Sequence, residues 1–220
     1  MMIRASAERG TTQLSWLHCR HSFAFGSYQE TEWRNFGPLL ALNEVHLAPG
    51  AKFPLHAHKN VDILTYPLAG QLSHLDTLTG SSILTKGTVQ LLKAGIGVEH
   101  TEGNASAYDT LQYLQVWLAP SESNSTPAYK KMHLEESVNR FQLQPFLISD
   151  KTKLFIGIFL KQFSTTYWIE GSGWLQLISG NIQINGQVVK AGDGLVIKSA
   201  MQLNLVSQDA AEFLLFEFSR

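Results

Sequence analysis

The chain has 220 residues, and its 44% of hydrophobic residues can form the core of one large or two small globular domains. Lysine plus arginine number 17 against 18 acidic residues, and this net charge of -1 excludes nucleic-acid binding driven by bulk charge. No apolar run reaches the roughly 20 residues of a membrane span, Cys19 has no disulfide partner, and the first ten residues lack a signal-peptide core, so we expect a cytoplasmic protein.

Short runs of β-branched and aromatic residues, separated by glycines, predict strands along the whole chain. Long helical periodicity is absent. The clearest runs are Val61 to Pro67, Gln112 to Leu118, Leu154 to Leu160 and Glu212 to Phe218. Asn185-Gly186, in QINGQV, is typical of a two-residue hairpin turn. We therefore expect an all-β protein.

The stretch GAKFPLHAHKNVDILTYPLAG, residues 50 to 70, sets His56 and His58 one residue apart. Side chains alternate across a strand, so both imidazoles point to one face, about 6 to 7 Å apart along the backbone, and can reach one ion. All eight histidines precede residue 134, so only the first half can hold a histidine metal site. Such a pair arises easily by chance, and therefore needs further support.

That support is VEHTEGN, residues 98 to 104, in which His100 and Glu102 repeat the one-residue spacing. Three imidazoles and one carboxylate form a mixed nitrogen and oxygen set that leaves positions open on an octahedral ion. This set favours one Fe ion, with Mn, Ni, Co, Cu or Zn as alternatives. Structural zinc fits poorly, because it prefers cysteines and a closed tetrahedron. The alternative is that all four are ordinary strand residues, solvated or hydrogen-bonded.

Two acidic residues lie close to these histidines in the sequence. Asp62 follows His58 by four residues and shares its face if the strand stays regular, so it is a candidate acceptor for a ligand imidazole's hydrogen bond. Glu99 should point away from His100, because neighbours on a strand face opposite sides.

The other histidines of the first half carry weaker signals. His74, in QLSHLD, alternates with Leu72 and is either a pocket wall or a surface strand residue. His18 and His21 flank Cys19 and resemble a metal cluster by composition. We assign that cluster no function, because a reactive cysteine needs an electropositive, accessible setting.

The run SESNSTP, residues 121 to 127, is small and polar, and it predicts a linker between two halves. The alternative is a long hairpin loop inside one domain. We predict an N-terminal barrel with the metal site over residues 1–120, a linker over 121–133, and a metal-free C-terminal barrel over 134–220.

A weak internal repeat supports two similar halves. LAGQL at residues 68–72, followed by KAG at 93–95, is echoed by ISGNI at 178–182, followed by KAGDG at 190–194. The sequence therefore predicts two β-barrels of one type.

Two motifs carry a resemblance to a known superfamily. Gly50-x5-His56-x-His58-x3-Asp62 and Gly97-x2-His100-x3-Asn104 resemble the two conserved motifs of the cupins. The longer segments SFAFGSY (22–28), NEVHLAPGAKFPLHAHKNVDILTYPLAGQLSHLD (43–76) and KAGIGVEHTEGN (93–104) resemble the pirin family, including its quercetinase-like members. This resemblance covers most of residues 16–120, and the C-terminal half matches only loosely.

The resemblance implies a fold and a ligand set. The fold is a pair of jelly-roll-like cupin barrels packed together, with the metal in the N-terminal barrel. The family's ligand pairs, HxH and HxE, align with His56, His58, His100 and Glu102. Asp62 stands where pirins commonly carry a glutamate, at a position that is not one of the four ligands.

The resemblance to quercetinase-like pirins implies a dioxygenase that opens a flavonol-like enolic substrate with O2 and releases carbon monoxide. Glu102 would serve as a ligand and as general base. One alternative is a redox-sensing regulatory or protein-binding module without turnover, because pirins are also associated with transcription factors and metabolic enzymes. Another is a metal-dependent isomerase that does not use O2.

These hypotheses differ in the partners and the pocket that they require. We expect a monomer that binds a small aromatic molecule or, in the regulatory case, a protein partner, without direct contact to nucleic acid or membrane. A pocket of roughly 300 Å³ or more beside the metal favours the enzyme, whereas a filled pocket and an exposed apolar patch favour the binding module.

Overall fold

The computed structural model describes residues 1–134 and 144–219. Apart from one short 3-10 helix, η1 (Ser6–Glu8), these residues form strands, turns and loops. The all-β prediction is therefore confirmed. Within the described part of the chain, no helix combines the length and apolarity that crossing a membrane requires.

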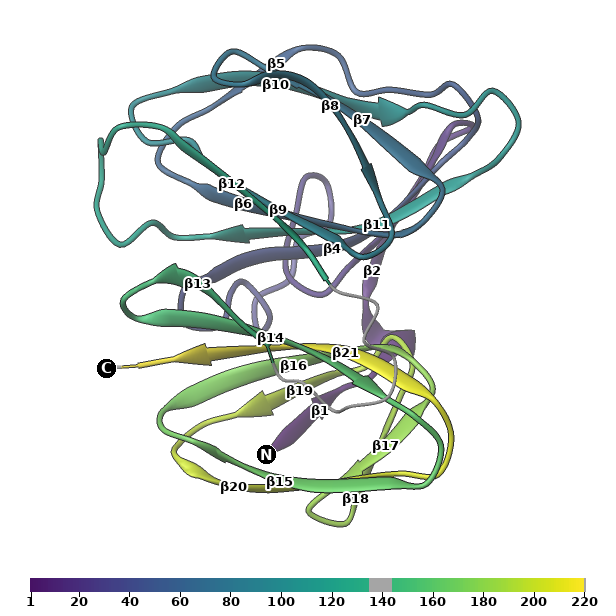
Figure 1. Cartoon of the computed structure of the whole chain (residues 1–220), viewed down its shortest axis with the longest axis vertical. Coiled ribbons are helices and arrows are strands. Elements are labelled where there is room, and N and C mark those ends of the chain that lie inside the picture. The colour runs from purple at the N-terminus through teal and green to yellow at the C-terminus, as the bar shows by residue number, and fades with distance from the viewer. Residues whose placement is uncertain (135–143, 220) are drawn as a thin grey trace. The chain divides into compact units, whose positions relative to one another are not determined.

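The chain forms two compact units, and each consists of two antiparallel sheets that face each other (Figure 1). The N-terminal unit comprises Gly10–Glu136. The C-terminal unit comprises Ser137–Arg220 together with Met1–Arg9.

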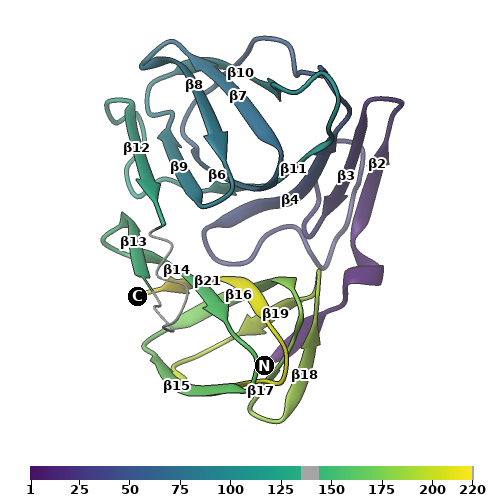
Figure 2. The same cartoon turned by 45° about the vertical axis from the view of Figure 1, so that its right-hand side comes forward.

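In the N-terminal unit, a seven-stranded sheet has the order β12-β9-β6-β11-β4-β3-β2, and a four-stranded sheet has the order β5-β10-β7-β8. Figure 2 shows β7, β8 and β10 lying across the barrel from β4, β6, β9 and β11. The strands are β2 (Gly10–Gln13), β3 (Leu17–His21), β4 (Leu39–Leu47), β5 (His56–His58), β6 (Asp62–Ala69), β7 (Gln71–Asp76), β8 (Gly80–Thr85), β9 (Thr88–Lys93), β10 (Val98–Asn104), β11 (Leu111–Leu118) and β12 (Ala128–His133).

The C-terminal unit has a six-stranded sheet in the order β1-β19-β16-β21-β14-β13 and a four-stranded sheet in the order β15-β20-β17-β18. The strands are β1 (Met2–Arg4), β13 (Gln144–Ser149), β14 (Thr152–Phe159), β15 (Phe163–Ile169), β16 (Ser172–Ser179), β17 (Asn181–Ile184), β18 (Gln187–Lys190), β19 (Gly194–Ile197), β20 (Met201–Ser207) and β21 (Ala211–Phe218).

The strands with strong local signals lie where the sequence predicts them. The four predicted runs coincide with β6, β11, β14 and β21 to within two residues at each end. Between β17 and β18, Asn185 has φ 49° and Gly186 has φ 80°. Positive φ at both central positions is what a type I′ turn requires, so the predicted hairpin is confirmed.

The unit boundaries differ from the predicted ones in two places. Met2–Arg4 pairs with β19, so residues 1–9 belong to the C-terminal unit. Ala128–His133, within the predicted linker 121–133, forms edge strand β12 against β9. β1 is too short to give a local sequence signal. β12 carries two lysines, which suit an exposed edge strand but also make its sequence look like that of a polar loop. Of the predicted domain 134–220, residues 135–143 and 220 lie outside the described residues.

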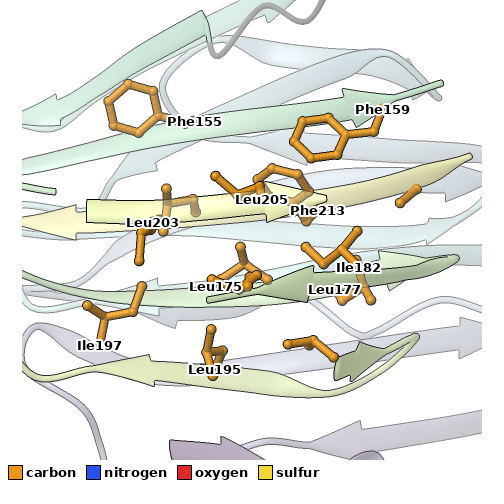
Figure 3. Packing of buried hydrophobic residues seen from close by; sticks show 14 of the residues in the cluster. Phe155, Phe159, Leu175, Leu177, Ile182, Leu195, Ile197, Leu203, Leu205 and Phe213 are labelled. Atoms are coloured by element: carbon orange, nitrogen blue, oxygen red, sulfur yellow. The ribbon is translucent and has the colours of Figure 1, made fainter. Parts of the chain in front are cut away.

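The interiors of the two units differ. In the C-terminal unit, fifteen buried residues form one continuous apolar cluster. Figure 3 shows part of it, with Phe155 and Phe159 of β14 above Leu203, Leu205 and Phe213. Among the described residues of the N-terminal unit, one cluster of buried apolar residues surrounds Val45 and Tyr113, and a separate one surrounds Ile63 and Leu92. Polar residues lie between them.

Candidate metal centre

Strand β10 brings the predicted pairs together. It is antiparallel to β5, with His100 opposite His56 and Val98 opposite His58. The three imidazole rings lie 4.5 to 4.8 Å apart between centroids. One ring nitrogen from each lies within 4.8 Å of the other two. His100 is fully buried, while His56 and His58 are half-buried, so this group can be reached from solvent.

The segment before β5 is held against β10 by backbone hydrogen bonds. The Phe53 N–H donates to the Glu102 carbonyl (2.8 Å), and the Asn104 N–H donates to the Ala51 carbonyl (2.8 Å). Between them, Lys52 crosses Gly103, where an added Cβ would lie only 2.6 Å from Lys52 Cβ. A glycine on β10 thus permits the close crossing that positions the start of β5.

The hydrogen bonds of two imidazoles leave one nitrogen of each ring available. His56 Nδ1 lies 2.8 Å from the Pro54 carbonyl oxygen, and since a carbonyl only accepts, Nδ1 carries a proton and Nε2 is the nitrogen that can bind an ion. His100 Nδ1 contacts His74 Nε2 at 3.2 Å. The Nε2 atom of His100 is buried and has no hydrogen-bond partner among the described residues. An orphaned buried nitrogen of this kind is what a metal ligand presents when the ion is left out.

Burial keeps the imidazoles of His58 and His100 neutral. Desolvation, followed by the charge of neighbouring His56, lowers the pKa of His58 to about 4. Desolvation, with smaller contributions from His56, His58 and His74, lowers the pKa of His100 to about 3. Because only a neutral imidazole coordinates a metal, protons do not compete for these nitrogens near pH 7.

Glu102 belongs to a second group of possible ligands. Its carboxylate joins His74 and His100 in a second group within 4.8 Å, rather than joining His56 and His58. Thr65 Oγ1 donates to its Oε1 at 3.2 Å, and Gln115 Nε2 donates a short hydrogen bond to its Oε2. Burial raises the pKa of Glu102 to about 7, although both donors favour the charged form. The two groups share His100.

His74 and Asp76 were not recognised as site residues from the sequence. On β7, His74 pairs with Glu102 and Asp76 with His100. His74 Nδ1 lies 3.2 Å from Asp76 Oδ2, and both side chains are fully buried. Desolvation lowers the pKa of His74 despite the nearby carboxylate. The available signal was HLD, which repeats the one-residue spacing of HAH and HTE in a third strand of the same sheet.

Asp62, the other predicted residue, has a different partner. Its Oδ2 lies 3.8 Å from Lys93 Nζ, and desolvation raises its pKa against the influence of that lysine. β5 ends at His58 and β6 begins at Asp62, with Asn60 at φ 54° between them. The strand is therefore not regular across this turn, and the shared face that the prediction assumed is lost. Glu99 is exposed on the face opposite His100, as predicted.

A row of polar side chains crosses the interior of the seven-stranded sheet opposite β10. Strand register pairs each member with the next, from His21 to Asn43, Gln115, Thr65 and Gln90. His21 is bonded on both ring nitrogens, to Thr12 Oγ1 and Asn43 Oδ1, each at 2.8 Å. This polar row separates the two apolar clusters. Burying polar groups weakens a core unless they are hydrogen-bonded, so their concentration here marks the interior as a site.

A pocket of about 440 Å³ lies over β7, β8 and β10. It is lined by Lys52, Ser73, His74, Leu75, Ser81, Ser82, Ile83 and Thr101. Its lining includes none of the four predicted ligands, so its size does not decide between the enzyme and the binding module. The ring of Trp117 lies beside the histidines, with its centroid 5.0 Å from that of His58.

Comparison with known proteins gives consistent results for both units. Residues 3–118 match the family described as Pirin, and residues 142–218 match the family described as Quercetinase C-terminal cupin domain. Quercetin 2,3-dioxygenase from Escherichia coli is 29% identical over 224 residues, covering 98% of this chain and 97% of that protein. A pirin-like protein from Caulobacter vibrioides is 28% identical and covers 94% of this chain and 95% of its own length.

Solved structures extend the likeness to three dimensions. The bacterial pirin YhhW from Escherichia coli, in complex with nickel(II), superposes with a TM-score of 0.90 at 27% identity, covering 99% of this chain and 98% of that one. The two predicted cupin barrels are thereby confirmed. With more than half of its length matched, the chain belongs to the pirin family.

Proposed function

We propose that the N-terminal unit binds one transition-metal ion and that the protein is a quercetinase-type dioxygenase acting on a flavonol-like enolic substrate. The observation that carries the proposal is the convergence of His56, His58 and His100, with the buried Nε2 of His100 left without a described partner. Relatives named quercetin 2,3-dioxygenase support the reaction, and the nickel-bound pirin supports the metal.

The residues fit such an ion. His56, His58 and His100 would hold it through ring nitrogens, and Glu102, whose carboxylate lies beside His100, would complete the set. Three nitrogens and one carboxylate favour Fe, while Mn, Ni, Co, Cu and Zn accept the same ligands. Bound there, the ion supplies Lewis acidity, which lowers the pKa of a hydroxyl that it contacts.

Glu102 is the proposed proton acceptor for the substrate hydroxyl. A general base must lie within hydrogen-bond reach of the proton that it takes, and Glu102 is a buried carboxylate beside His100, the ligand that belongs to both groups. Thr65 and Gln115 hold one oxygen each and fix the carboxylate in place, while each oxygen keeps a further lone pair for a proton.

An aromatic substrate has a suitable surface beside the histidines. Trp117 meets His58 edge to face, and Phe25 meets Trp117 in the same way at 5.0 Å between centroids. Aromatic rings stack and pack against such edges and faces, so this pair would orient a flat flavonol.

The proposal is tested by metal analysis of the purified protein, followed by aerobic incubation with quercetin. We expect one equivalent of metal, loss of the flavonol absorbance, and carbon monoxide in equal amount to the quercetin consumed. His58→Ala is the control: it removes one of three imidazoles, and should abolish both stoichiometric metal and turnover. A full equivalent of metal in that variant would show that the ion lies elsewhere.

The outcome without turnover is also informative. If the wild-type protein holds its ion and consumes no flavonol under O2, the dioxygenase proposal is wrong, and a regulatory or protein-binding role becomes the better account. Turnover of an enolic substrate that continues without O2 would indicate an isomerase.

A further inference from the structure

Asp76 is fixed by the turn that joins β7 to β8. Its Oδ1 accepts the backbone N–H groups of Leu78 (2.7 Å) and Thr79 (2.6 Å), and its Oδ2 accepts the Thr79 hydroxyl (2.8 Å). The carboxylate therefore keeps its position without help from His74. It is also fully buried, so its negative charge acts on its neighbours with little screening.

This charge determines which nitrogen of His74 carries the proton. Asp76 Oδ2 lies 3.2 Å from His74 Nδ1, and this buried nitrogen has no hydrogen-bond partner among the described residues. A proton is stabilised on the nitrogen closest to a carboxylate, so neutral His74 is protonated on Nδ1 and its Nε2 is bare. A bare Nε2 can only accept a hydrogen bond.

The same argument continues to His100. Its Nδ1 lies 3.2 Å from His74 Nε2, and since that atom accepts, His100 Nδ1 must donate. A neutral His100 with its proton on Nδ1 has its lone pair on Nε2, the buried nitrogen without a partner. Three side chains on two neighbouring strands thus have one consistent set of proton positions.

We infer that Asp76 and His74 are positioning residues that hold His100 in the tautomer able to bind a metal through Nε2. The inference rests on the proposed metal site and adds to it two residues that contact neither the ion nor the substrate. Partners of this kind, behind a ligand histidine, typically change metal affinity by about 10- to 100-fold when they are replaced.

Asp76→Asn tests this inference because it keeps the size of the side chain and reverses the direction of the bonds. The Asn oxygen can still accept the two backbone N–H groups of the turn, while its amide donates to His74 Nδ1. His74 then carries its proton on Nε2 and donates to His100 Nδ1, so the proton of His100 moves to Nε2. We expect the affinity for Ni(II), measured by titration calorimetry, to fall by about 10- to 100-fold.

The proton positions can be measured without any metal. In metal-free protein labelled with ¹⁵N histidine, the His100 ring shifts should indicate a bare Nε2 in the wild type and a bare Nδ1 in Asp76→Asn. If Asp76 only stabilised its turn, Asp76→Asn would not move the proton of His100 from Nδ1 to Nε2. If the wild type binds no Ni(II), the proposed function fails, whereas the tautomer result remains readable.

Asp193→Asn is the matched control in the other unit. Asp193 also accepts two backbone N–H groups, from Ser6 (2.7 Å) and Lys190 (3.0 Å), one on each carboxylate oxygen, so its replacement disturbs backbone hydrogen bonds at least as much as Asp76→Asn does. Its Ni(II) affinity should equal that of the wild type.

If Asp76→Asn does not fold, His74→Phe decides the question, because it leaves the turn intact and removes the acceptor for His100. We then expect two His100 tautomers and weaker Ni(II) binding. Unchanged His100 shifts together with wild-type affinity, in either folded variant, would overturn the inference.

Discussion

The buried carboxylate of Glu102 accepts hydrogen bonds from Thr65 and Gln115 of the opposite sheet. Desolvation favours its neutral form, whereas these two donors favour the charged form. Thr65 and Gln115 belong to neighbouring strands and are paired in register, so they reach the two oxygens of Glu102 from adjacent positions. Among the four proposed ligands, Glu102 is the carboxylate, which can both coordinate an ion and accept a proton. It is therefore the residue at which metal binding and proton transfer can be separated by mutation.

Glu102→Gln should retain much of the metal and lose most of the turnover. Glutamine keeps the size and one oxygen ligand, while its charge and basicity are lost, so the three imidazoles should still hold the ion more weakly. General bases typically contribute about 10²- to 10⁴-fold, and we expect the rate of quercetin consumption to fall by at least about a hundredfold. The comparison uses samples with equal metal content. An equal rate in the metal-loaded variant would limit Glu102 to a ligand role.

At the scale of elements, β10 is the central strand of the site. It carries His100 and Glu102, pairs with β5 on one side and with β7 on the other, and is crossed at Gly103 by the segment that leads to His56. Displacing that segment should move a ligand without changing any ligand residue.

Gly103→Ala is the corresponding experiment. The new methyl group would lie 2.6 Å from Lys52 Cβ and 3.2 Å from the Ala51 carbonyl oxygen, so the segment must move away from β10. Overpacking of this kind typically costs about 1–3 kcal/mol, and we expect lower thermal stability together with weaker metal binding.

Adding Lys52→Gly to Gly103→Ala provides the matched control. It removes the atom that the methyl group meets first, so the double variant should recover part of the lost metal affinity, as a favourable coupling energy in a double-mutant cycle. Additive losses in the double variant would indicate that the crossing does not position β5.

Long strands can be predicted from the sequence alone, whereas short strands with distant partners cannot. β6, β11, β14 and β21 are long runs of β-branched and aromatic residues, and their signal is local. β1 has three residues, and its pairing depends on a partner almost two hundred positions later, so no local pattern reveals it. The pairs HAH and HTE can be recognised from their one-residue spacing within the sequence, whereas His74 requires the register of β7 against β10.

At the scale of the whole molecule, the two units divide their roles. The N-terminal unit interrupts its core with the polar row, whereas the C-terminal unit keeps one continuous apolar cluster. All groups of metal-ligating side chains found among the described residues belong to the N-terminal unit, and the sequence after His133 contains no histidine. We predict that the C-terminal unit binds no metal.

Hydrogen exchange followed by mass spectrometry, with and without Ni(II), can resolve the two units. A ligand at 100 times its dissociation constant stabilises the state that binds it by about 2.7 kcal/mol, so exchange from β5, β7 and β10 should slow markedly. The exchange rates of peptides from β14 and β16 should change least. In His58→Ala, Ni(II) should change the exchange of neither set of strands. Direct protection of the C-terminal strands in His58→Ala would point to a second metal site there.

The pairing of β1 with β19 has a consequence for the order in which the protein is made. Met2 lies opposite Val196, so a strand that leaves the ribosome early must wait for one made near the end of translation. The whole N-terminal unit emerges in the interval, and domains generally fold as units during synthesis. The N-terminal unit lies between β1 and β19 in the sequence. Once it has folded, the chain between these two strands is compact rather than flexible, which lowers the entropy lost when β1 pairs with β19. The histidines can therefore assemble before the other unit has received its final strands.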